Sequence, residues 1–264
     1  MMDHQKIAVS EPISLLVRDI WIFEDTDTNG DTHLPFFADG YPGLLFQQTQ
    51  NGLFIKPHQK LMPVSFLYGQ TIQPITMELE GAYLLIVFRL FPFVFKSFFD
   101  VDPKTLNDEC YDLETFQGID IPSFNQELLR LETVALKIDA ISEFLATLLK
   151  QKREKLDFKI KQVIERIIQT QGKENIRTIA ERLHIHVRTL ERRFMRETGL
   201  SPKQFAKIIQ FQGSLEKLTV KDFQQMNEVV YAHGFADQSH FIKVFKTFTH
   251  QTPGAFQKGI NEKN

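Results

Sequence analysis

The stretch GFADQSHFIKVFKTFTHQTPGAF, residues 234–256, decides how the C-terminal part of the chain is interpreted. Phe241 and Phe245 recur four residues apart among polar side chains, which predicts an amphipathic helix over 238–248. Thr252 and Pro253 predict the start of another helix, because Thr caps helices and Pro fits the first turn. A short helix over 222–233 is expected just before this stretch.

The same pattern occurs earlier, in TLERRFMRETGLSPKQF, residues 189–205. At a shift of 51 residues, the positions that match are Leu190 with Phe241, Phe194 with Phe245, Pro202 with Pro253 and Phe205 with Phe256. At a shift of 50, the matches are Ile176 with Met226, Ile179 with Val229, Ala180 with Val230 and Leu183 with His233. The second copy therefore has one extra residue in its turn. Each copy predicts a helix, a tight turn, a second helix and a third helix begun by proline, which is the helix-turn-helix arrangement.

The second helix of such a unit lies in the major groove of DNA, with its polar face toward the bases. The polar faces here carry Arg188, Glu191, Arg192 and Arg196 in the first copy, and Gln238, Ser239, His240, Lys243 and Lys246 in the second. Arg binds guanine, Gln pairs with adenine, and Lys or Arg neutralises phosphates. The alternative is that these are only the solvated faces of small helices. Because the pattern occurs in two matching copies, the DNA-binding interpretation is favoured over this alternative.

The helices around these copies complete a helical region from Asp157 onward. Helices are expected over 157–171, 176–183 and 187–198, and a long one begins at Ser201-Pro202 and runs to about Leu218. About 17 residues at 1.5 Å rise give a helix of ~25 Å. Such a helix can place the two units about one helical turn of DNA, ~34 Å, apart.

Residues 234–256 resemble the signature of the AraC/XylS family of bacterial transcription regulators, and residues 177–202 resemble the first helix-turn-helix of that domain. The resemblance covers about 157–258 and implies seven helices, with the two units in successive major grooves of double-stranded DNA and RNA polymerase as a possible partner. It implies base-reading roles for Arg188, Glu191, Arg192, Gln238, Ser239, His240 and Lys243. Phosphate contacts are expected from Arg196, Lys203 and Lys246. His184 and His186 stand where the family usually has Gly and Ser, so a less regular first unit is expected.

The preceding part of the chain is expected to be β-rich. Short apolar runs bounded by turn residues predict strands over 14–22, 44–48, 52–56, 64–68, 75–78 and 82–90, which suggests a barrel or sandwich. Asn51-Gly52 predicts a hairpin. Ser123 is expected to cap a helix over about 124–150. The whole is thus an α+β chain with a domain boundary near 151–156: a β-rich regulatory or dimerisation domain, 1–150, and a DNA-binding domain, 151–264.

Charge supports this division. The formal net charge is -2, but residues 1–150 carry 10 Lys/Arg and 21 Asp/Glu, whereas residues 151–264 carry 21 and 12. A basic C-terminal half suits a polyanionic partner. The single cysteine, the lack of a signal-peptide pattern and the lack of an apolar run of ~18 residues predict a cytoplasmic protein with no membrane partner.

Residues 35–46, 69–75 and 88–99 resemble, more loosely, the N-terminal domain of one group of AraC-type regulators. This implies a regulatory module whose ligand is uncharacterised, and it assigns no binding residues. A small-molecule effector and a homodimer are both open possibilities. The phenylalanine-rich run 91–99 is expected to pack in a core, with an apolar ligand pocket or a dimer surface as the alternative.

The sequence gives only weak indications of a metal site or of catalysis. His184 and His186 form a pair without further metal ligands, and Asp25, Asp27 and Asp31 lack the closing Glu of a calcium loop. Cys110 lies among carboxylates that raise its pKa, which makes it a poor nucleophile. No catalytic residue, metal site or cofactor is therefore expected, and the chain is not expected to be an enzyme. The alternatives are a cupin-like enzyme that carries a DNA-binding domain, or an architectural DNA binder without an effector.

Overall fold

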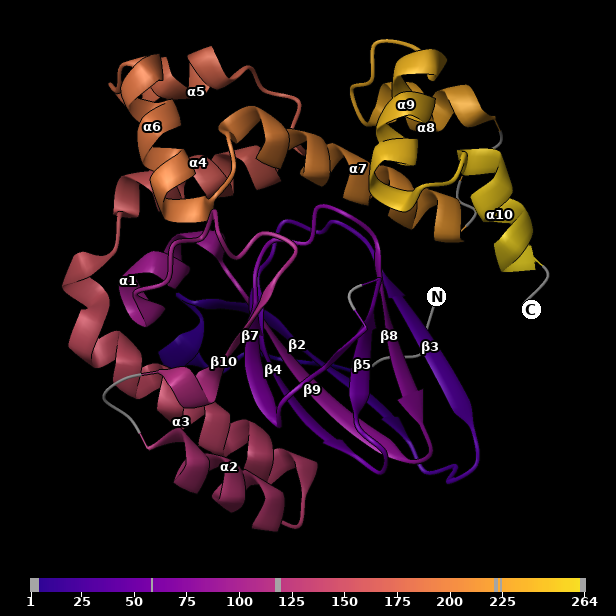
Figure 1. Ribbon diagram of the computed structural model, residues 1–264. Coiled ribbons are helices and arrows are strands. Elements are labelled where there is room, and N and C mark those ends of the chain that lie inside the picture. Colours follow the sequence, from indigo (N-terminus) through magenta and orange to yellow (C-terminus); the bar gives the residue numbers. More distant parts are fainter. Residues whose placement is uncertain (1–4, 58, 117–119, 221–222, 224, 262–264) are drawn as a thin grey trace.

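The computed structural model describes residues 5–57, 59–116, 120–220, 223 and 225–261. Two antiparallel sheets form the N-terminal half, several helices follow them, and the C-terminal half is helical (Figure 1). This confirms the expected α+β class. None of the helices within the described residues is long and apolar enough to cross a membrane.

The two sheets face each other across a small apolar core. The first has six strands in the order β1 (Gln5–Ile7), β2 (Val17–Asp25), β9 (Tyr83–Leu90), β4 (Gly43–Thr49), β7 (Ser65–Tyr68) and β10 (Cys110–Asp112). The second has four, in the order β3 (Asp31–Phe36), β8 (Ile75–Glu80), β5 (Leu53–Lys56) and β6 (Lys60–Leu61). Leu45, Phe66 and Val87 of the first sheet meet Leu53 and Leu79 of the second in this core.

The hairpin predicted at Asn51-Gly52 is wrong. β4 pairs with β7 and β9, whereas β5 pairs with β6 and β8, so the turn carries the chain from one sheet to the other. Gly52 does adopt a positive φ of 92°, as the turn chemistry suggested. The burial patterns explain the outcome, because five consecutive residues of β4 are buried while β5 alternates between buried and exposed. β4 is a central strand covered on both faces.

Helices cover the outer face of the six-stranded sheet. They are the 3₁₀ turns η1 (Glu11–Ile13), η2 (Pro92–Val94), η3 (Leu113–Thr115) and η4 (Arg153–Lys155), and the helices α1 (Phe95–Phe99), α2 (Ile121–Arg130) and α3 (Val134–Lys152). The single helix expected over 124–150 is two, because the chain breaks between Arg130 and Val134 and Thr133 caps the second helix. Asp120, not Ser123, caps the first: its carboxylate accepts a hydrogen bond from the Ser123 amide.

The C-terminal half follows the sequence expectations closely. Its seven helices within the described residues are α4 (Phe158–Gln169), α5 (Ile176–Arg182), α6 (Val187–Thr198), α7 (Pro202–Val220), α8 (Met226–Ala232), α9 (Gln238–Thr249) and α10 (Pro253–Asn261). Asp157 caps α4, and Ser201 and Gln204 form a reciprocal capping box at the start of α7. Residues 221, 222 and 224, part of the helix expected over 222–233, lie outside the described residues.

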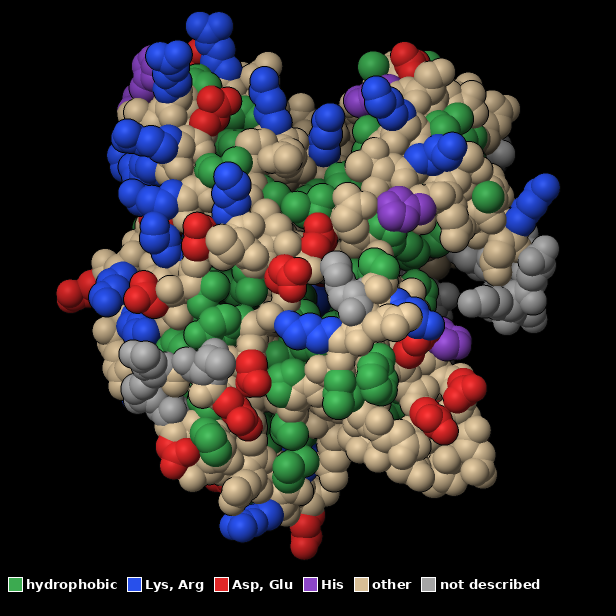
Figure 2. Space-filling view, viewed as in Figure 1, with side chains coloured by type: hydrophobic (Ala, Val, Ile, Leu, Met, Phe, Trp, Pro, Cys, Tyr) green, Lys and Arg blue, Asp and Glu red, His purple; other side chains and the backbone are tan. Residues whose placement is uncertain are grey.

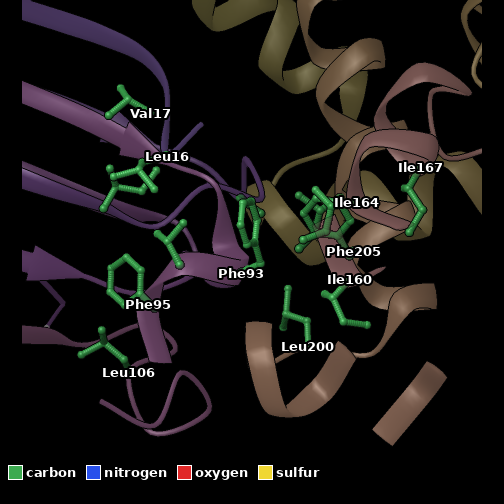
Figure 3. Packing of buried hydrophobic residues seen from close by; sticks show 14 of the residues in the cluster. Leu16, Val17, Phe93, Phe95, Leu106, Ile160, Ile164, Ile167, Leu200 and Phe205 are labelled. Atoms are coloured by element: carbon green, nitrogen blue, oxygen red, sulfur yellow. The ribbon is translucent and has the colours of Figure 1, made fainter. Parts of the chain in front are cut away.

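The main hydrophobic core runs without interruption from the outer face of the six-stranded sheet into the helical half. Phe93, from the phenylalanine-rich run 91–99, lies between the two halves and faces Phe205 and Ile164 (Figure 3). Phe95, Phe98 and Phe99 are also buried. The run therefore packs in the core, as expected, and joins the sheet to the C-terminal helices.

Candidate DNA-binding surface

The first helix-turn-helix unit consists of α5 and α6. Leu190 and Phe194 are fully buried on the inner face of α6, and the Phe194 ring lies 5.7 Å from that of Phe205 in α7. The opposite face of α6 presents the predicted contact residues to solvent: Arg188, Arg192 and Arg196 are exposed and Glu191 is half-buried. Lys203, at the start of α7, is also exposed.

The second unit consists of α8 and α9 and repeats this arrangement. Phe241 and Phe245 are fully buried on the inner face of α9, where Phe245 lies 5.5 Å from Phe211 of α7. The outer face presents the predicted residues of the second copy: Gln238, Ser239, Lys243 and Lys246 are exposed and His240 is half-buried. Both second helices have twelve residues. The first unit is thus as regular in length as the second.

The turns of the two units are built alike. His184 and Gly234 are equivalent in the repeat, and both have a positive φ, 51° and 75°. The next amide closes the turn in each copy: Ile185 donates to the Ala180 carbonyl at 2.9 Å, and Phe235 donates to the Val230 carbonyl at 3.0 Å. The two turns differ only in the distance to the helix cap. His186 directly follows Ile185, whereas Ala236 stands between Phe235 and Asp237, so Ala236 is the extra residue of the second turn.

Ion pairs fix one side of α6. Arg193 holds Asp157, the cap of α4, through two hydrogen bonds of 2.9 and 2.6 Å. Arg196 lies 2.7 Å from Glu197 and 3.8 Å from Asp157. Within the described part of the chain, no ion pair involves Arg188 or Arg192. The guanidinium groups of these two residues are therefore free to meet a ligand.

The two units lie at the same end of the molecule, on the side away from the sheets, and α7 joins them (Figure 1). α7 has 19 residues, a length of about 28 Å at 1.5 Å per residue. Lys and Arg side chains gather over the first unit and also mark the second (Figure 2). The two basic surfaces are built alike, and α7 lies between them.

The sheet domain holds a buried ionic cluster beside α7. The Arg89 guanidinium lies over the rings of Trp21 and Tyr41, and its Nε is 3.4 Å from Asp19 and 3.2 Å from Asp39. Burial raises the pKa of Asp39 to about 6, against the opposing effect of Arg89. Sequence reasoning missed this cluster, since its members come from three separate segments.

A cavity of about 30 Å³ lies between the sheets, lined in part by Met62, Tyr68, Asp108 and Cys110. Small-molecule sites usually measure about 300–1,000 Å³, so the cavity is far below that size. Burial raises the pKa of Cys110 to about 12, with Glu109 as a smaller cause. Among the described residues, no three His, Cys, Asp or Glu side chains are grouped as a metal site would need.

Comparison with known proteins finds a family match within each half of the chain. Residues 179–259 match the family described as a helix-turn-helix domain, which is of AraC type, and residues 5–112 match a domain of unknown function, DUF6597. Both matches confirm the resemblances seen in the sequence. No curated protein sequence is similar enough to match the chain.

Solved structures that are similar to this chain match it with TM-scores below 0.5. ToxT from Vibrio cholerae is 15% identical, with 90% of this chain and 97% of that one covered and a TM-score of 0.46. The DNA-binding domain of AdpA, solved with a target DNA, is 21% identical over 40% of this chain and 95% of that one, with a TM-score of 0.37. A DNA-binding transcriptional dual regulator from Escherichia coli K-12 is 21% identical over 39% and 93%, with a TM-score of 0.35.

Proposed function

Because the chain carries an AraC-type helix-turn-helix domain behind a DUF6597 domain, we propose that it regulates transcription by binding a specific DNA sequence with two recognition helices. In this proposal α6 and α9 enter successive major grooves on one side of double-stranded DNA. The domain division is proposed to fall near residues 151–156, where η4 separates α3 from α4.

The observation that carries the proposal is the equivalence of α6 and α9. Each has two fully buried apolar anchors on one face and polar, largely exposed side chains on the other, and each follows the same tight turn. Stability alone requires only the buried face. It does not require two repeated faces of arginine, lysine and glutamine at one end of a molecule, which is what groove binding uses.

We assign roles by chemistry and position. Base reading is assigned to Arg188, Glu191 and Arg192 in α6 and to Gln238, Ser239, His240 and Lys243 in α9. Phosphate contacts are assigned to Arg196, Lys203 and Lys246. Arg196 already lies between Glu197 and Asp157, so its phosphate contact would compete with those carboxylates.

The sheet domain is assigned the regulatory role, since it packs directly on the DNA-binding helices through Phe93 and its neighbours. The cavity of about 30 Å³ is too small to serve as an effector site without rearrangement. A small-molecule effector, a homodimer, RNA polymerase contact and a cytoplasmic location stay predictions.

The test begins with the full chain and a random pool of duplex DNA, from which repeated selection recovers the preferred sequence. Gel-shift titration on that sequence then compares the natural chain with Arg192→Ala and Lys243→Ala. Each variant is expected to lose ~1–3 kcal/mol of binding free energy, the usual value of a good base contact. Affinity should also fall steeply with salt, because phosphate contacts release counterions.

Arg130→Ala and Lys150→Ala are the matched controls. Both residues are exposed and lie on α2 and α3, away from the two units, and each control removes the same charge as its partner variant. The controls should bind like the natural chain. Selection that enriches no sequence, or equal affinity of all four variants, would contradict the proposal.

A further inference from the structure

The first unit is held to the sheet domain by buried contacts. α6 packs against η2 and α1, where Phe93 is fully buried, and Leu200 just after α6 is 2% exposed. Asn107 donates a hydrogen bond of 3.0 Å from Nδ2 to the Gly199 carbonyl. Gly199 lies so close to the chain at Pro103 that an added Cβ would stand 2.6 Å from its carbonyl oxygen. The first unit and the sheet domain therefore form one packed body.

The second unit meets the same domain through exposed or partly exposed side chains. The Phe37 ring lies 5.8 Å from the Phe256 ring of α10, edge to face, and both are half-buried. His250 Nε2, at the end of α9, lies 3.0 Å from the Gln73 side-chain oxygen, and both residues are exposed. We call these two pairs, Phe37–Phe256 and Gln73–His250, the latch.

The latch reaches the recognition helix directly. Phe256 lies 5.5 Å from Phe245, one of the two buried anchors of α9. His250 is the residue that ends α9 in the left-handed conformation, with φ 57°, and its equivalent in the first copy is Gly199, with φ 74°. The sheet domain thus touches the C-terminal end of both recognition helices at equivalent residues.

One loop platform makes both of these end contacts. The Asp108 carboxylate accepts hydrogen bonds from the amides of Ile72 and Gln73, at 2.6 and 2.8 Å, and the Asp108 amide donates to the Gln70 carbonyl. Residues 69–73 are thereby tied to residues 102–108. The first segment contacts His250 and the second contacts Gly199.

From this asymmetry we infer that the latch is a conformational switch: it fixes the position of the second unit against the sheet domain. Its opening frees the second unit from that domain, while Phe241 and Phe245 keep α9 packed on α7, so the second unit reorients together with the C-terminal part of α7. Exposed hydrogen bonds and partly exposed ring contacts contribute little, because water replaces them, whereas buried packing is costly to break. We therefore expect thermal motion to break the latch contacts before it breaks the buried contacts of the first unit. The consequence for DNA binding rests on the proposed function: a change in the loop platform would alter the spacing of the two helices through the second unit.

The test measures distances between pairs of spin labels in the full chain, without DNA. In a Cys110→Ser background, the label sites are Arg177→Cys in the first unit, Tyr231→Cys in the second and Leu61→Cys in the sheet domain, which are 77%, 67% and 57% exposed. In the double variant Phe37→Ala, Gln73→Ala, the 177–231 and 61–231 distance distributions are expected to broaden. The 61–177 distribution is expected to keep its width.

Phe158→Ala with Gln151→Ala is the matched control, since it removes an exposed phenylalanine and an exposed glutamine outside the latch. It should leave all three distributions unchanged. The single variant Gln73→Ala, an exposed site that does not endanger folding, should give an intermediate broadening. Unchanged 61–231 distances in the double variant, or equal broadening of 61–177, would overturn the inference. Because no DNA is present, the result is independent of whether the chain binds DNA as proposed.

Discussion

At the scale of single residues, the two copies of the repeat serve as controls for each other. His184 takes a left-handed conformation where the second copy has Gly234, and His186 precedes α6 where Asp237 precedes α9. His233 is buried, whereas the equivalent residue of the first copy, Leu183, is half-buried. Each of these differences marks a residue where one copy gives up a local stabilising feature that the other keeps.

The cap of α6 gives the first prediction. The Asp237 carboxylate accepts a hydrogen bond of 2.7 Å from the His240 amide, whereas His186 makes no side-chain cap bond. His186→Asp should raise the free energy of unfolding by ~1 kcal/mol, because it supplies the missing acceptor. Urea unfolding measures the change. His186→Ala is the control and should not stabilise; a stabilisation equal to that of the Asp variant would rule out capping as the cause.

His233 gives the second prediction. This residue is 5% exposed, and neither ring nitrogen has a hydrogen-bond partner within the described residues. The ring packs against Gly213 so closely that a Cβ added to Gly213 would lie 2.6 Å from His233 Nδ1. Burial, followed by the charges of Lys173 and Lys217, lowers its pKa from 6.5 to about 4. Between pH 6.5 and about pH 4, the His233 imidazole is protonated in the unfolded chain but neutral in the folded chain. The free energy of unfolding therefore falls as pH drops from 6.5 toward 4.

His233→Leu, which copies Leu183 of the first unit, should remove this pH dependence. The natural chain should lose on the order of 1–2 kcal/mol more than the variant between pH 7.5 and pH 5. Urea unfolding at the two pH values measures the difference. Other groups also titrate in this range, so the test compares the natural chain with the His233→Leu variant. If the free energy of unfolding changes with pH equally in both, His233 is not responsible for the pH dependence.

At the scale of elements, Asp157 links two helices. Its carboxylate caps α4 by accepting from the Ile160 amide at 3.2 Å, and it also binds Arg193 of α6 through both oxygens. Asp157→Ala should lower the free energy of unfolding by about 2–3 kcal/mol, since it removes a cap and leaves Arg193 unpaired. Asp157→Asn retains the capping oxygen and should lose less. Thermal or urea unfolding of the three chains tests this, and equal losses in both variants would show that the cap contributes nothing.

The helices and strands also show which parts of the fold can be predicted from the sequence. The C-terminal helices are predictable because most of them begin at a capping residue, such as Asp157 or Ser201, and end at a turn, such as that at Gly199. β3 was missed, because Asp31–Phe36 follows a run of polar turn residues and contains a proline. The Asn51-Gly52 turn was recognised, but its local chemistry does not say whether the two flanking strands pair with each other.

At the scale of the whole molecule, the charge division was visible in the sequence but the packing of the two halves was not. The acidic and basic halves share one hydrophobic core, and Phe93 gives no signal in the sequence that its partner lies in α7. Long-range contacts of this kind depend on topology, which local patterns do not encode. The faces of α6 and α9 were predictable because helical periodicity fixes them. Their common orientation toward one end of the molecule required the structure.

The central claim is that α6 and α9 read two neighbouring major grooves. Chemical footprinting of the full chain on its selected DNA tests this most directly. Two protected major-groove segments, about 10 base pairs apart on one side of the duplex, are predicted. Arg192→Ala should weaken protection of one segment and Lys243→Ala that of the other. A single protected segment, or variants that weaken both segments equally, would contradict the account.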